Sequence, residues 1–102
     1  MQVENIKAQT QVQAIATGCN FLISSATGQP LLTVNPGHPV VEGLSISGRL
    51  LDGICSLLRR VTDDPDETVN PPELFAVQVA LDAVLAIQVA CRRGLESEEG
   101  EA

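Results

Sequence analysis

The stretch from Asn70 to Gly94 constrains the fold most, because helix start and stop signals flank a nearly unbroken apolar run. Asn70 is a preferred N-cap residue, and Glu73 follows three residues on, where its side chain can bond back to the cap. Pro71 suits a first turn, where a missing N–H costs nothing. Gly94 is a natural residue to follow a helix. The sequence therefore predicts a helix over 71–93.

The faces of this helix predict association. At about 100° per residue, one side gathers the polar residues Gln78, Asp82, Gln88, Arg92 and Arg93. Leu85 and Val89 fall in the middle of that polar strip. A helix that is apolar on nearly all sides is normally buried on nearly all sides, and one partner helix cannot cover it. We therefore expect a homodimer, and the candidate interface residues are Leu81, Asp82, Leu85 and Val89.

A second helix is predicted over 39–62, beginning at Pro39 and continuing with helically spaced apolar residues. The acidic, breaker-rich loop that follows is short enough to make the two helices antiparallel neighbours. A hairpin of about 55 residues is too small for a core of its own to supply much stability. The predicted fold is therefore all-α, with two helical hairpins pairing into a four-helix bundle.

The residues before the hairpin are harder to interpret. The segment 30–34, PLLTV, is a short extended candidate that must pack on the helices or pair with its copy in a second chain. In the preceding arm, 1–29, the segments 11–16 and 20–24 are compatible with short strands around a turn at Thr17-Gly18, or with a flexible arm. The predicted domain covers 30–94, and 95–102 is predicted to be a disordered acidic tail.

Composition excludes several classes of function. The 102 residues fit one domain, and the formal net charge of −7 argues against binding nucleic acid or anionic lipid. Three cysteines without a CxxC motif, and a start that does not resemble a signal peptide, predict a reducing cytoplasm. The apolar run from Leu74 to Cys91 carries three polar residues, so we expect a soluble helix rather than a membrane span.

We find no residue set that predicts catalysis, a cofactor or a metal. His38 is the only histidine, and Cys55 lies about 25 Å along the same helix from it. The pairs Arg59-Arg60 and Arg92-Arg93 are weak candidates for an anion patch. Antiparallel helices put these pairs at opposite ends, so their favoured role is to complement the helix C-termini.

The segment PLLTVNPG, the helix with Leu50-Leu51 and Cys55, the acidic break and the Ala-rich second helix together resemble a known family. It comprises the short pseudomonad proteins grouped as domain of unknown function 3077. The similarity covers Pro30 to about Gly94, and the sequence departs from the family pattern at Leu32 and in a longer break over 65–72. The resemblance implies a small cytoplasmic bacterial helical protein and implies no activity.

The sequence leaves three functions open. The favoured one is a non-enzymatic interaction or regulatory protein that works through its helical surface, as a homodimer or with another protein. The second is a small-molecule or nucleotide binder with a pocket between subunits, in which the four arginines contact an anion. The third is an inhibitor encoded by a mobile element that mimics nucleic acid through its thirteen acidic residues.

Overall fold

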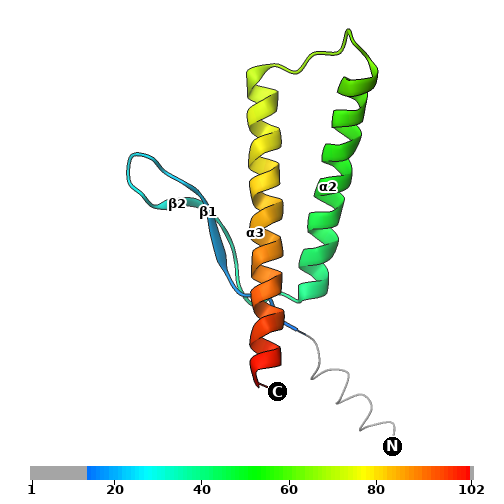
Figure 1. The fold of residues 1–102 in the computed structure, drawn as a ribbon. Coiled ribbons are helices and arrows are strands. Elements are labelled where there is room, and N and C mark those ends of the chain that lie inside the picture. Colours follow the sequence, from blue (N-terminus) through cyan, green and yellow to red (C-terminus); the bar gives the residue numbers. More distant parts are fainter. Residues whose placement is uncertain (1–13, 102) are drawn as a thin grey trace, which may run out of the picture.

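The computed structural model describes residues 14–101, which form two strands followed by two helices (Figure 1). The elements are β1 (Cys19–Ile23), β2 (Pro30–Val34), α2 (Val40–Asp63) and α3 (Pro71–Glu101). The all-α prediction, with its four-helix bundle, is wrong, because the fold mixes the helices with a two-stranded sheet. The physical reason is that β1 packs against α3, on a helix that the bundle would have covered with helices alone.

The two strands form an antiparallel hairpin in which Cys19 lies opposite Val34 and Ile23 opposite Pro30. Its turn is closed by hydrogen bonds from the Ser24 N–H to the Gln29 carbonyl and from the Gly28 N–H to the Ser24 carbonyl, both 2.8 Å long. The segment 30–34 thus finds its partner within its own chain. The strand expected at 20–24 is present one residue earlier, but it pairs with β2 instead of 11–16, of which 11–13 lie outside the described residues.

The helices α2 and α3 run antiparallel and meet closely only near the start of α2 (Figure 1). Gly43 lies so close to α3 that an added Cβ would stand 2.6 Å from Cys91 Sγ. One turn later, Gln88 Nε2 donates a 2.7 Å hydrogen bond to the buried Ser47 Oγ. Beyond this contact the helices diverge toward their connecting loop. The small side chains near the start of α2 therefore set where the pair is held together.

The predicted capping box opens α3. The Glu73 N–H donates to Asn70 Oδ1 at 3.0 Å, and the Asn70 N–H donates to Glu73 Oε1 at 3.1 Å. The start of α3 at Pro71 matches the sequence pattern, and α2 begins one residue later than expected, after Pro39.

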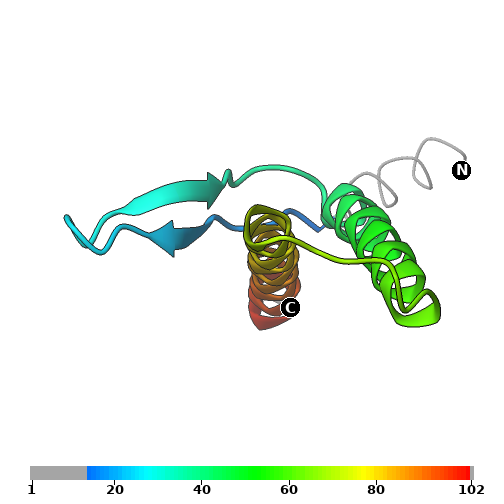
Figure 2. The same ribbon diagram turned by 90° about the horizontal axis from the view of Figure 1, so that it is seen from above.

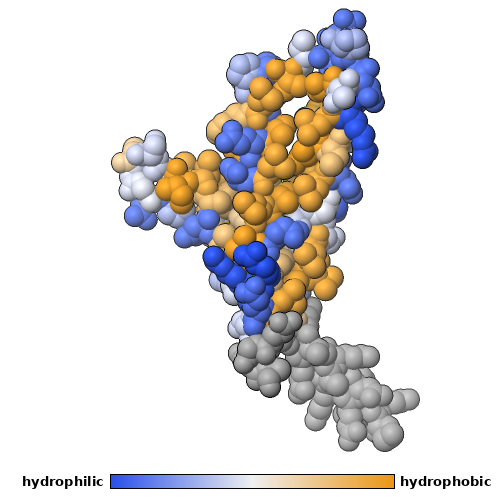
Figure 3. Space-filling view, viewed as in Figure 1, coloured by the Kyte–Doolittle hydropathy of each residue, from blue (hydrophilic) through white to orange (hydrophobic). Residues whose placement is uncertain are grey.

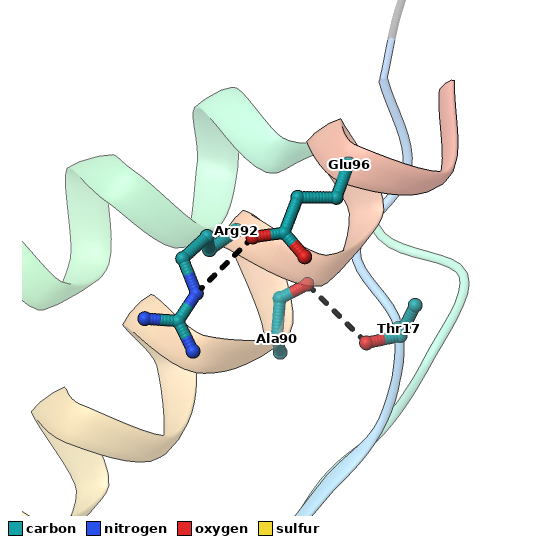
Figure 4. Close-up of polar contacts among 4 residues, drawn as sticks. All are labelled: Thr17, Ala90, Arg92 and Glu96. Atoms are coloured by element: carbon teal, nitrogen blue, oxygen red, sulfur yellow. Dashed lines mark hydrogen bonds and ion pairs between the residues drawn. The ribbon is translucent and has the colours of Figure 1, made fainter. Parts of the chain in front are cut away.

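Residues 14–18, the N-terminal strap, tie the four elements together. The Ala16 N–H donates to the His38 carbonyl at 2.8 Å, and the Val40 N–H donates to the Ala14 carbonyl at 2.9 Å. The N–H of Thr17 donates to the Ala90 carbonyl of α3, and so does the Thr17 hydroxyl, whose bond Figure 4 shows. The small buried core lies beneath this strap and comprises Ala16, Val40, Ala90 and Cys91.

The predicted helix end at Gly94 is wrong, and the strap accounts for the glycine at that position. α3 continues through Gly94 to Glu101, so the segment expected to be a disordered tail is helical as far as Glu101. A Cβ at Gly94 would lie 2.8 Å from the carbonyl carbon of Ile15 and 3.0 Å from Ala16 Cα. Gly94 is therefore a site of close backbone approach inside a helix, and not the residue that ends one.

The molecule is open rather than globular. Seen along α3, the β1–β2 hairpin projects sideways beyond both helices (Figure 2). The radius of gyration is 18.1 Å, against about 13 Å for a compact domain of 100 residues. Much of each helix is therefore left without a covering layer.

We predict that Gly94→Ala destabilises the fold. An alanine inside a helix is usually favoured over glycine by about 1 kcal/mol. Here its Cβ would collide with the strap backbone, and the net loss should be about 1–3 kcal/mol. Urea unfolding followed by circular dichroism measures the change.

The matched control for this change is Gly48→Ala. Gly48 lies inside α2, and a Cβ there meets no atom within 4 Å. This variant should be as stable as the parent chain, or more stable by about 1 kcal/mol. Equal stabilisation by both substitutions would show that the strap does not cross α3 at Gly94.

Candidate functional site

One side of α3 carries large apolar side chains that nothing in the described chain covers. Leu85 is 63% exposed and Leu81 is 42% exposed, and in the first turns of the helix Leu74 and Phe75 are 54% and 59% exposed. The view in Figure 3 shows hydrophobic atoms in a band over both helices. Only 22% of the most apolar 18-residue window of α3 is buried. The sequence predicted that α3 would be buried on nearly all sides. In the structure, the described chain buries a minority of its apolar residues.

The apolar side of α3 faces β1 across a groove of about 510 Å³. All five residues of β1 line it. From α3 the lining residues are Asp82, Leu85, Ala86, Val89 and Arg93. We call this the β1–α3 groove. Three of the four predicted interface residues line it, and the fourth, Leu81, is exposed one position before Asp82.

An unusual backbone conformation shapes the strand wall of the groove. Leu22 has φ 53°, in the left-handed region that residues with a Cβ seldom adopt. The distortion lies within the part of β1, Phe21, Leu22 and Ile23, that contributes the apolar residues of this wall. Such strain is concentrated where structure serves function.

Two charged residues stand at the ends of the groove's α3 wall. Asp82 is half-buried, and Arg93 is exposed three turns further along the helix. Among the described side chains the one ion pair joins Arg92 Nε to Glu96 Oε1 at 3.6 Å (Figure 4), and neither Asp82 nor Arg93 takes part in it. Exposed pairs of this kind contribute little to stability. The groove is thus apolar along its middle, with a negative group at one end and a positive group at the other.

A second apolar cleft, of about 400 Å³, opens where α2 and α3 diverge. Leu50, Ile54 and Leu57 line it from α2, and Ala76, Val77 and Ala80 line it from α3. Arg49 and Glu73 are its charged lining residues. This cleft is a second surface that the described chain leaves uncovered.

The structure does not bring the four arginines of the weak anion-patch prediction together. Arg59 and Arg60 lie in the last turns of α2, and Arg92 and Arg93 lie in the later part of the antiparallel α3. The two pairs are therefore at opposite ends of the helix pair (Figure 1). Arg93 instead belongs to the β1–α3 groove.

His38 and Cys55 are separated in the same way as the sequence implied. His38 precedes α2, whereas Cys55 is exposed in its second half. Within the described residues, no group of three or more histidine, cysteine, aspartate or glutamate side chains is placed to hold a metal ion.

The buried cysteine has a structural setting. Cys91 Sγ donates to the Val40 carbonyl at 3.6 Å, within the core beneath the strap. Burial raises the pKa of the Cys91 thiol above its ordinary value of 9.0. A raised pKa keeps the thiol protonated and unreactive, which suits a small hydrophobe of the core rather than a nucleophile.

The sequence did not indicate the strand side of the groove. The segment 20–24 was expected to be a short strand or part of a flexible arm, and nothing in that pattern shows that β1 packs against α3. The sequence placed Arg93 at the end of the helix, but in the structure α3 continues to Glu101. The alternation of polar and apolar residues around α3 was the one signal that pointed to this surface.

No family model, curated protein or solved structure matches the chain. The resemblance to domain of unknown function 3077 therefore stays a prediction. Within the segment Pro71–Ser97, the most apolar 18-residue window has a mean hydropathy of 2.0, and the helix is long and apolar enough to cross a membrane. Core helices of soluble proteins share these properties, so this is weak evidence for a membrane span.

We predict that the three thiols react in an order set by burial. At pH 8, iodoacetamide should modify the exposed Cys55 first and Cys91 last. The reaction at Cys91 should be slower by on the order of 100-fold, because the reagent reaches it only through an opening that costs a few kcal/mol. Mass spectrometry of the peptides measures the rates, and comparable rates at Cys55 and Cys91 would contradict the buried setting.

The raised pKa of Cys91 also predicts a pH dependence. Below pH 9.0 the thiol is protonated in both the folded and the unfolded chain. Above pH 9.0 the unfolded chain releases this proton first, so the free energy of unfolding should fall as the pH rises. The fall should be smaller in Cys91→Ala, which is the control for the other groups that titrate in this range.

Proposed function

We propose that this chain is a non-enzymatic interaction protein whose binding surface is the apolar side of α3 together with β1. One observation supports this proposal: Leu85, in the middle of α3, is 63% exposed, and the residues on either side of it in the sequence are apolar. Large apolar patches are uncommon on proteins that act as isolated monomers, and they mark sites of association.

The chemistry of the groove suits association better than catalysis. Its centre is apolar, and its charges stand at the rim. Interfaces commonly have this arrangement, an apolar centre inside a polar rim. A regulatory role would follow from the identity of the partner, which we expect to be a second copy of this chain.

A site-specific cross-linking experiment tests the proposal. The photoreactive residue benzoylphenylalanine is placed at position 85 in the groove, and at position 58 as a control. Leu58 is also an exposed apolar residue, on α2, and it does not line the groove. Illumination in cells should give discrete protein adducts from position 85 and few from position 58.

Either of two results would count against the proposal. One is that position 85 gives no adduct with any protein. The other is that positions 85 and 58 give the same set of adducts, which would mean that exposed apolar residues are merely sticky. Mass spectrometry of the adducts then shows whether the captured partner is the same chain or a different one.

A further inference from the structure

We infer that the β1–α3 groove is filled by α3 of a second copy, lying antiparallel to the first, with Asp82 of each copy paired with the partner's Arg93. This inference rests on the proposed function, in that it assigns an occupant to the same surface. It adds the orientation of the two helices and the contacts that fix their register.

The groove residues of α3 form one continuous stripe. Asp82, Leu85, Ala86, Val89 and Arg93 all line the groove, and their side chains fall within about 100° of one another around the helix. The stripe is about 16 Å long from Asp82 to Arg93. It is therefore a straight, helix-length surface with opposite charges at its two ends.

The charges select an antiparallel arrangement. In a two-fold dimer, residue i of one copy contacts residue j of the other, and j contacts i. If the axis passes beside the bond between Ile87 and Gln88, Asp82 meets Arg93 of the partner subunit at both ends. A parallel two-fold pair would instead set Asp82 against the partner's Asp82, and Arg93 against the partner's Arg93. Like charges placed opposite each other suppress that pairing.

The same axis matches the apolar centre. It places Ala86 opposite the partner's Val89, with both residues in the groove of each copy. Ala86 is only 3% exposed in the single chain and forms the floor of the groove, so the partner helix would lie over the half-buried Val89. Helix axes usually pack 8–10 Å apart in such contacts. Leu85, the most exposed of the large apolar residues on α3, gains cover from both the partner helix and the partner's strand.

The polar residues of the stripe also argue against a lipid occupant. A membrane around α3 would place the half-buried Asp82 at the middle of an 18-residue apolar window, where a carboxylate is strongly disfavoured. A second copy instead offers Asp82 a cation. The dimer thus accounts for the apolar and the charged members of the stripe together.

Charge exchange tests the register. Asp82→Arg and Arg93→Asp each replace two attractive contacts of the symmetric dimer with two repulsive ones, and each should weaken dimerisation about 10- to 100-fold. A mixture of the two single variants restores both attractions across the interface. The mixture, and the double variant Asp82→Arg/Arg93→Asp, should therefore dimerise about as tightly as the parent chain. Sedimentation velocity measures each species.

Matched controls separate this effect from net charge and from misfolding. Asp52→Arg and Arg59→Asp make the same charge changes on exposed positions of α2, outside both the groove and the second cleft, and should leave dimerisation unchanged. Misfolded single variants could not be rescued by mixing, so recovery in the mixture itself excludes that explanation. Leu85→Glu should dissociate any complex formed through the groove, whatever its register.

The outcomes are distinguishable. Dimerisation by both single variants alone, together with a monomeric Leu85→Glu, would overturn the antiparallel register and leave the proposed function standing. A parent chain that is monomeric at micromolar concentration, yet cross-links from position 85 to a different protein, would overturn the second copy as occupant. Association of the parent chain only with phosphatidylcholine vesicles would overturn both proposals.

Discussion

The crossing of the N-terminal strap over α3 at Gly94 is the contact on which the rest of the fold depends. There the backbone of Ile15 and Ala16 lies against a helix residue that has no side chain, and Thr17 bonds to the carbonyl of Ala90. This crossing holds the start of α2 through Val40 and delivers β1 onto α3. A fold with so small a core needs such a backbone anchor, because few apolar side chains are available to position the hairpin.

The anchor places β1 against α3 but does not bury the helix. Burial of apolar surface contributes roughly 25 cal/mol per Å², and the exposed side of α3 leaves part of that contribution unrealised. Each edge of the two-stranded sheet also lacks a neighbour among the described residues. We propose that β1 and α3 together form one half of an interface, which a second copy of the chain completes.

The helices were predictable because their signals are local. The Asn70–Glu73 capping box and the proline at each helix start depend on a few neighbouring residues, and both predicted starts lie within one residue of the observed ones. The sheet and the end of α3 depend on contacts between distant segments. Gly94 has the sequence signature of a helix end, yet the approach of Ile15, 79 positions earlier, gives it a different role. The helical periodicity of about 100° per residue placed Leu85 and Val89 on a face that needs a partner. It carried no information on which strand lies beside them.

The central claim is that the stability of this chain depends on a partner for α3. Anything that binds only the folded state raises the unfolding temperature with its concentration. Thermal unfolding followed by circular dichroism, at protein concentrations about a hundredfold apart, tests this most directly. The account predicts a midpoint that rises by several degrees at the higher concentration. A midpoint that is independent of concentration, with complete and reversible unfolding, would show that the single chain is stable with its apolar face uncovered.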